Sequence, residues 1–73
     1  MRVTIIPADG KVVIDGVVKV GLDLSFMADI HAVQWYGTEG EIERMDERNR
    51  HSNEEIISLE PFQAAIDAWN SAT

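Results

Sequence analysis

The chain has 73 residues, of which 13 are acidic and 6 are Lys or Arg; its formal net charge is −7, and it contains no cysteine. A chain of this length forms one domain, 1–73, which buries only about 60% of the surface that its unfolded form exposes. The absence of cysteine excludes a disulfide framework and a cysteine-ligated zinc site. The acidic excess disfavours nucleic acid as a partner, because binding to phosphates depends on Lys and Arg.

The sequence contains no segment typical of a membrane-spanning helix or a secretion leader. No apolar run approaches the roughly 18 residues of a membrane-spanning helix. The run Val3–Ile6 after Arg2 is too short for the apolar segment of a secretion leader. We therefore expect an intracellular protein with no membrane partner, for which homo-oligomerisation would add buried surface to a small core.

Three short β-branched runs separated by turn residues predict an antiparallel β-meander at the N-terminus. The runs are Val3–Ile6, Lys11–Ile14 and Val17–Val20, and the turns are Ala8-Asp9-Gly10 and Asp15-Gly16. The two Asp-Gly pairs are interpreted as turns and not as calcium ligands, because the spacing and the bidentate Glu of an EF-hand are missing.

The middle of the chain predicts a connector followed by a hairpin. Residues 21–29 lose the strand pattern and contain one helical turn, for which Asp23 or Ser25 is the candidate cap. The hairpin consists of a strand over Ile30–Tyr36 with Val33 and Trp35 inward, a turn over Gly37–Gly40, and a return strand over Glu41–Met45 with Ile42 inward.

The segment Asp46–Glu55 has no apolar side chain and predicts an exposed loop. Ile56 and Ile57 then re-enter the core. The loop and its flanks hold a basic cluster formed by Arg44, Arg48, Arg50 and His51. This cluster either binds an acidic surface or is neutralised by Asp46, Glu47, Glu54 and Glu55, and the second interpretation is favoured because exposed ion pairs are common and weak.

An amphipathic helix is predicted at the C-terminus. Ser58 and Pro61 mark its start, and Phe62, Ile66 and Trp69 form one apolar stripe at helical spacing. A helix this short is unstable alone in water, so it must pack on the strands, with Trp69 expected to face Trp35. The predicted fold is therefore α+β: an antiparallel β-meander or small sheet of four to five strands with one C-terminal α-helix packed on one face.

Catalysis is not expected. No cysteine can act as a nucleophile, and none of the serines lies in a Gly-x-Ser-x-Gly elbow. His31 is interpreted as a partly buried strand residue with a hydrogen bond, in preference to a ligand. No catalytic residue, cofactor site or metal site is predicted.

The candidate interaction residues are Tyr36, Gln34, Glu39, Glu41 and Glu43. If Val33, Trp35 and Ile42 face the helix, strand alternation directs this other set to solvent. An aromatic side chain among charges is typical of a protein contact patch. The three glutamates could also bind a hard cation, but a solvated outer face is the simpler interpretation.

Several segments spread over nearly the whole chain carry a resemblance: Ile14-Asp15-Gly16-Val17, Ile30–Gly37, Gly40-Glu41-Ile42-Glu43, Asn53-Glu54, Leu59-x-Pro61-Phe62-Gln63 and Ile66-Asp67-Ala68-Trp69. In these segments the chain resembles a group of small proteins encoded by tailed bacteriophages and prophages, near tail and tail-fibre genes. Most of these proteins are uncharacterised, and the resemblance implies no site residues. The stretch Arg48–Ser52 departs from the shorter link expected of this group.

The resemblance and the composition together leave three hypotheses. The first is a non-enzymatic phage tail-associated protein, either a minor virion component or a tail-fibre assembly factor, that binds another protein. It would be made in the host bacterial cytoplasm, and it either stays there or enters the virion. The second is a small acidic inhibitor of a host protein, such as an anti-defence factor, whose carboxylates imitate nucleic-acid phosphates. The third, an enzyme, is disfavoured by the missing nucleophile and metal signatures.

Overall fold

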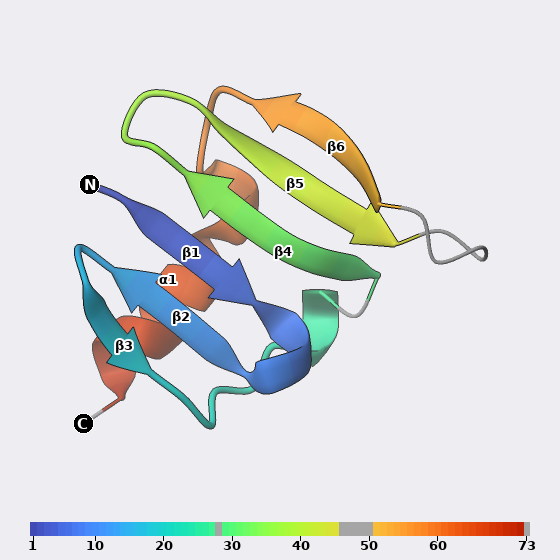
Figure 1. Ribbon diagram of the computed structural model, residues 1–73. Coiled ribbons are helices and arrows are strands. Elements are labelled where there is room, and N and C mark those ends of the chain that lie inside the picture. Colours follow the sequence, from blue (N-terminus) through green and yellow to red (C-terminus); the bar gives the residue numbers. More distant parts are fainter. Residues whose placement is uncertain (28, 46–50, 73) are drawn as a thin grey trace.

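The computed structural model of the chain describes residues 1–27, 29–45 and 51–72. It has an α+β fold in which one antiparallel sheet is covered on one face by a C-terminal helix (Figure 1). The predicted fold class is confirmed, but the sheet has six strands where four or five were expected. The strands are β1 (Val3–Ile6), β2 (Lys11–Ile14), β3 (Val17–Lys19), β4 (Ile30–Trp35), β5 (Gly40–Met45) and β6 (His51–Ile56).

The strands lie in the order β3-β2-β1-β4-β5-β6, and each neighbouring pair is antiparallel. β1, β2 and β3 form the predicted meander. In the turn between β2 and β3, Asp15 has a φ of 48° and Gly16 a φ of 85°. Two consecutive positive φ values define the type I′ turn that suits a two-residue hairpin. β1 pairs with both β2 and β4, which joins the meander to the β4–β5 hairpin (Figure 1).

β6 corrects the prediction of an exposed loop over Asp46–Glu55. Residues 51–55 belong to β6 and pair with β5, with Glu55 opposite Glu41. Residues 46–50 lie outside the described residues. The prediction relied on the missing apolar side chains. An edge strand, however, is stabilised by ladder hydrogen bonds to its neighbour and can keep charged side chains in water.

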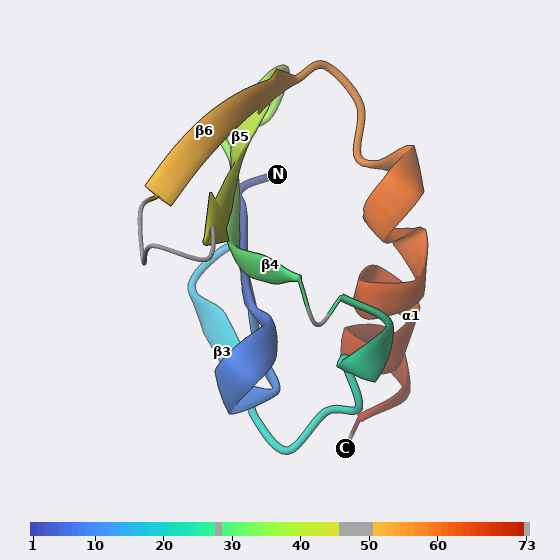
Figure 2. The ribbon, with the colours of Figure 1, turned by 90° about the vertical axis from the view of Figure 1, so that its right-hand side faces the viewer.

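A helical layer packs on one face of the sheet (Figure 2). It consists of α1 (Gln63–Ser71), the 3₁₀ turn η3 (Glu60–Phe62) before it, and a second 3₁₀ turn η2 (Ser25–Met27) beside it, whereas the 3₁₀ turn η1 (Pro7–Asp9) joins β1 to β2. Among the described residues, no helix is long and apolar enough to cross a membrane. The core between the layers comprises Val3, Ile5, Val12, Ile14, Leu24, Met27, Val33, Trp35, Ile42, Phe62, Ala65 and Ile66.

The segment between β6 and α1 differs from the prediction at Ile57. Ser58 Oγ accepts a hydrogen bond from the Glu60 N–H at 3.1 Å, which forms a local turn just before η3. Ile56 packs against the core as predicted. The expected burial of Ile57 is wrong: its side chain is 84% exposed. Alternation explains the difference, since consecutive residues at the end of a strand point to opposite sides.

The connector before β4 contains the predicted helical turn, η2. The Asp23 carboxylate accepts hydrogen bonds from the N–H and the hydroxyl of Ser25, at 3.2 and 2.8 Å. These bonds cap the turn and hold the pKa of Asp23 below its usual value. Leu24 and Met27 are buried in the core, so the connector closes one end of the space between sheet and helix.

Trp69 attaches the end of α1 to the edge of the sheet. Its Nε1–H donates a hydrogen bond to the Val17 carbonyl oxygen at 3.1 Å. Trp35 lies on β4, three strands away from β3 in the sheet, which corresponds to about 14 Å at the usual strand spacing. The two indole rings are therefore placed apart, in contrast with the expected pairing, because α1 runs far enough across the sheet for its last turn to reach β3.

Lys19 fastens the C-terminus of α1 to β3. Its Nζ donates hydrogen bonds to the carbonyl oxygens of Trp69 and Ala72, both at 2.8 Å, and lies 4.2 Å from the centroid of the Trp69 ring. The last carbonyls of a helix have no partners within the helix and carry partial negative charge. One ammonium group thus satisfies two such oxygens and stacks on an aromatic face.

We expect the substitution Lys19→Met to lower the free energy of unfolding by about 1–2 kcal/mol, because it keeps the apolar stem but removes the ammonium. Urea denaturation followed by circular dichroism measures the change. Lys11→Met, on the neighbouring strand β2, is the control and should shift the free energy by less than about 0.5 kcal/mol. Equal denaturation midpoints for the Lys19→Met variant and the unsubstituted chain would contradict the fastening role.

Candidate functional site

The face of the sheet opposite α1 carries the predicted interaction residues. One row of side chains crosses it, with Thr4, Gln34, Glu41 and Glu55 opposite one another on β1, β4, β5 and β6. Thr4 Oγ1 donates a hydrogen bond to Gln34 Oε1 at 2.8 Å, which holds the amide in place. Because α1, η2 and η3 all lie on the other side (Figure 2), we call this surface the open face.

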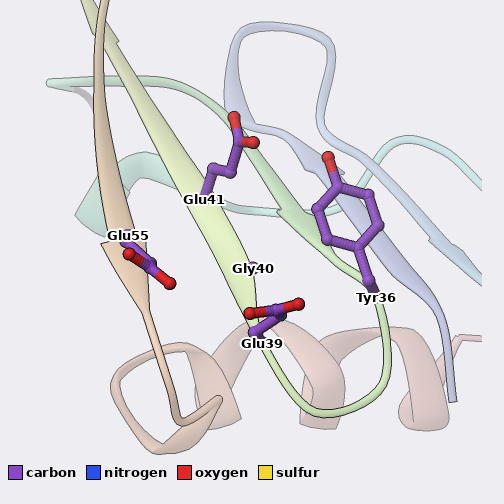
Figure 3. A pocket seen from close by; sticks show the side chains of 5 residues that line it. All are labelled: Tyr36, Glu39, Gly40, Glu41 and Glu55. Atoms are coloured by element: carbon purple, nitrogen blue, oxygen red, sulfur yellow. The ribbon is translucent and has the colours of Figure 1, made fainter.

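A pocket of about 360 Å³ opens at one end of the open face (Figure 3). Tyr36 forms one side of it and Glu55 the other, with Glu39, Gly40 and Glu41 between them. Tyr36 directly follows β4, Glu39 lies in the β4–β5 turn, and the other three residues belong to β5 and β6. The result is a concave surface in which three carboxylates surround a space with one aromatic wall.

The β4–β5 turn positions the Tyr36 ring. The Tyr36 N–H donates a hydrogen bond to the Glu39 carbonyl oxygen at 2.8 Å, which closes the turn. Gly37 has a φ of 113°, a conformation that residues with a side chain rarely adopt. Trp35 is buried on the core side, so alternation directs Tyr36 to the open face, where it is 50% exposed.

Arg2 makes the one ring contact described for Tyr36. Its guanidinium carbon lies 5.7 Å from the centroid of the Tyr36 ring. The Arg2 N–H also donates a hydrogen bond to Asp15 Oδ1 at 2.9 Å, which ties the start of β1 to the β2–β3 turn. A guanidinium can therefore approach the Tyr36 ring at the distance of a cation–π contact.

The structure brings three of the five predicted interaction residues together. Tyr36, Glu39 and Glu41 line the pocket, while Gln34 and Glu43 lie on the open face outside its lining. Alternation along β4 and β5 accounts for the shared face, and the tight turn brings Tyr36 and Glu39 close together.

Glu55 is a pocket residue that the sequence analysis placed in a loop. Its position follows from the pairing of β6 with β5, which sets it opposite Glu41. The signal in the sequence that could have found it is Ile56, an apolar residue at the end of a polar segment. An apolar side chain that returns to the core requires its neighbour Glu55 to point to the opposite face.

Arg44, one member of the basic cluster, forms two ion pairs. Its Nη1 lies 3.0 Å from Asp29 Oδ2, and its Nε lies 3.1 Å from Glu54 Oε2. Arg44 is thus paired with carboxylates; Glu54 is one of those expected to neutralise the cluster, whereas Asp29 is not. Arg48 and Arg50 lie outside the described residues.

The titratable side chains do not form a metal centre in the part of the chain that the structure describes. No group of three or more His, Cys, Asp or Glu side chains there is placed to hold a metal ion. His31 is partly buried on β4, and His51 begins β6.

Comparisons with protein-family models, with curated proteins and with solved structures find no match to this chain. The functional interpretation consequently rests on the geometry of the open face and on the sequence itself.

Proposed function

We propose that the chain is a protein-binding module whose contact surface is the open face around the Tyr36 pocket. The observation that supports this most is the position of a half-exposed tyrosine among three glutamates at a concave site. Tyrosine is enriched among the residues that dominate binding energy in protein interfaces. The surrounding carboxylates would orient a partner of complementary charge and raise its association rate.

The chemistry of the pocket favours a partner that presents an arginine or lysine side chain. The Tyr36 ring can accept a cation on its face and pack against the apolar stem. Glu39, Glu41 and Glu55 supply negative charge around the same space. Arg2 provides an example within the chain of a guanidinium beside this ring.

We further propose that the partner is a tail component of a tailed bacteriophage. On this view the chain is a minor virion component or a tail-fibre assembly factor, made in the host bacterial cytoplasm, and it carries out no reaction. The support for this setting is the resemblance of the sequence to small proteins of the phage tail-gene region. The support for binding as the mode of action is the pocket.

The alternative is an acidic inhibitor of a host protein that imitates nucleic-acid phosphates. Such a mimic needs negative charges spread regularly along an extended surface, as in a nucleic-acid backbone. On the open face the carboxylates lie towards β5 and β6, whereas the row continues over β1 and β2 with the uncharged Thr4 and Val13. This confinement favours a local contact centred on Tyr36.

We expect Tyr36→Ala to weaken partner binding by about tenfold or more, because the aromatic wall of the pocket is lost. The measurement is capture of phage proteins from infected bacteria by the immobilised chain, followed by titration with the purified partner. Asn70→Ala is the control, since Asn70 is exposed on α1 in the layer on the other side of the sheet.

Salt and a triple variant distinguish the two candidate functions. A contact centred on the Tyr36 ring should weaken only modestly as salt rises, because the pocket glutamates supply part of the attraction, whereas binding by a phosphate mimic should weaken steeply. Replacing Glu39, Glu41 and Glu43 by Gln should abolish a mimic and only reduce a tail contact. If neither Tyr36→Ala nor the triple variant alters partner capture or phage infectivity, the open face is not the binding surface.

A further inference from the structure

β3 forms one edge of the sheet and exposes apolar side chains there. The strand order ends at β3, so within the described residues it pairs with β2 alone. Val17 and Val18 are each 52% exposed, and Val20, just after the strand, is 66% exposed. An edge strand with exposed apolar side chains is a template for pairing with a further strand.

β3 is short, with three residues, but it lacks a free charged side chain that would protect such an edge. Natural edge strands often carry a lysine whose charge opposes pairing with another strand. Lys19 is the one charged residue in Val17–Val20, but its ammonium group is bound by the carbonyl oxygens of Trp69 and Ala72. The Lys19 ammonium therefore binds the end of α1 and is not free to oppose strand pairing at this edge.

The hydrogen-bonding pattern of the β2–β3 hairpin leaves the backbone of Val18 directed outward. Val17 and Lys19 lie opposite Ile14 and Val12. In a hairpin closed by a two-residue turn these are the residue pairs that exchange ladder hydrogen bonds, because such pairs alternate along an antiparallel ladder. The Val17 carbonyl also accepts the indole N–H of Trp69. Val18 thus offers one N–H and one C=O to a strand added at this edge.

The opposite edge of the sheet is much less suited to pairing with itself. β6 carries Glu54 and Glu55, both exposed. Two copies of this strand placed side by side would bring like charges together, which is unfavourable across a strand pair. The two edges visible at opposite ends of the sheet in Figure 1 therefore differ in kind: one is acidic and the other is apolar.

We propose that β3 pairs with β3 of a second copy of this chain. An antiparallel pair centred on Val18 is self-complementary, because the Val18 N–H of each copy would meet the Val18 C=O of the other. The two six-stranded sheets would then form one continuous sheet. On the open face, the two Val18 side chains would lie side by side across the symmetry axis.

The distribution of charge also fits a second copy. Of the acidic side chains described in residues 37–73, most lie on or beside β5 and β6. In the strand order, β5 lies four strands from β3, which corresponds to about 19 Å at the usual strand spacing. This distance exceeds the Debye length of about 8 Å at physiological salt. Pairing through β3 therefore keeps the acidic ends of the two copies far apart in spite of the net charge of −7.

Analytical ultracentrifugation of the full chain tests this proposal directly. From micromolar to millimolar concentration, the mass should rise from 8.2 kDa towards twice that value. Val18→Lys places two like charges opposite each other across the axis and should weaken dimerisation at least about tenfold. Val18→Thr keeps a β-branched residue with a strand preference and should retain the dimer.

A variant at the other edge serves as the matched control. Ile57→Lys removes an exposed apolar side chain beside β6 and should leave dimerisation unchanged. Amide hydrogen exchange at Val18 should slow as the concentration rises, whereas packing of valine side chains alone would leave that amide in contact with water. Circular dichroism of each variant checks that the fold is kept.

Three outcomes would overturn the proposal: a monomer at all concentrations, a dimer that Val18→Lys leaves intact, or a dimer that Ile57→Lys abolishes. A monomer whose β3 instead binds an extended segment of another protein would also replace the second copy as the occupant. The pocket lies at the β5–β6 end of the sheet, so Val18→Lys should not alter binding at Tyr36. The experiments can therefore support or contradict the β3 dimer and the Tyr36 binding surface independently of each other.

Discussion

Replacing Trp69 by alanine should lower the free energy of unfolding by about 3 kcal/mol, a large part of the stability of so small a domain. The ring packs against the core from the last turn of α1, donates a hydrogen bond to the Val17 carbonyl oxygen, and lies under the Lys19 ammonium. Its loss removes these three side-chain contacts and leaves the Lys19 hydrogen bonds to the backbone carbonyls of Trp69 and Ala72 to hold the helix end to β3. Urea denaturation followed by far-ultraviolet circular dichroism measures the effect.

Two variants divide this effect into its parts. Trp69→Phe keeps an aromatic ring but loses the indole N–H, so we expect a smaller loss of about 1 kcal/mol. Asn70→Ala changes the exposed neighbour on the same helix and should have an effect below about 0.5 kcal/mol. A Trp69→Ala variant that unfolds cooperatively at an unchanged urea concentration would show that α1 is not held through this residue.

Gly40→Ala should destabilise the chain by about 3 kcal/mol or more. A Cβ atom at Gly40 would clash with the Gln34 carbonyl oxygen and lie 3.0 Å from both Cα and Cε3 of Trp35. Backbone atoms of β4 cannot rotate away as a side chain could, so β4 and β5 would have to separate. The same shift would displace Tyr36 and Glu41, and we expect the variant to lose partner binding as well.

Gly21→Ala is the control for this steric effect. Gly21 has a φ of 73°, and a Cβ atom there would meet nothing within 4 Å. Its substitution should therefore cost about 1–2 kcal/mol from the left-handed conformation alone. Thermal unfolding of the two variants side by side checks the difference. A Gly40→Ala variant at least as stable as Gly21→Ala would contradict the close packing of β4 against β5.

Local patterns in the sequence were sufficient for much of the fold. The strands Val3–Ile6 and Lys11–Ile14 have the predicted bounds, because β-branched residues between turn signals strongly favour a strand. Asp15-Gly16 forms a type I′ turn as expected, because this turn needs a positive φ at both central residues, and Asp-Gly is one of the pairs that tolerate it. The stripe of Phe62, Ile66 and Trp69 was recognised because a helix this short must bury one face.

The parts that were missed depend on neighbours distant in the sequence. β6 carries little apolar signal, and its pairing partner β5 is what makes it a strand. Gly40 was expected to belong to the turn, but it is buried opposite Trp35, and the approach of the two strands requires a residue without a Cβ atom. No local pattern contains either relationship.

The candidate site likewise combines residues that local patterns predict with one that depends on a distant strand. Alternation along the hairpin was enough to direct Tyr36, Glu39 and Glu41 towards the same side. The pocket itself also needs Glu55, which follows Glu41 by 14 positions and reaches the site only through the β5–β6 pairing. A concave site built by three strands and a turn thus appears only when the strands are assembled.

Site-specific photo-crosslinking tests the proposed binding surface most directly. An aromatic photo-crosslinking amino acid replaces Tyr36 in one version of the chain and Asn70 on α1 in another, and both are produced in phage-infected bacteria. The account predicts one defined adduct from position 36, whose yield falls but does not vanish when Glu39, Glu41 and Glu43 are replaced by Gln, and no such adduct from position 70. An adduct formed from position 70 and not from position 36 would contradict the assignment of the open face as the binding surface.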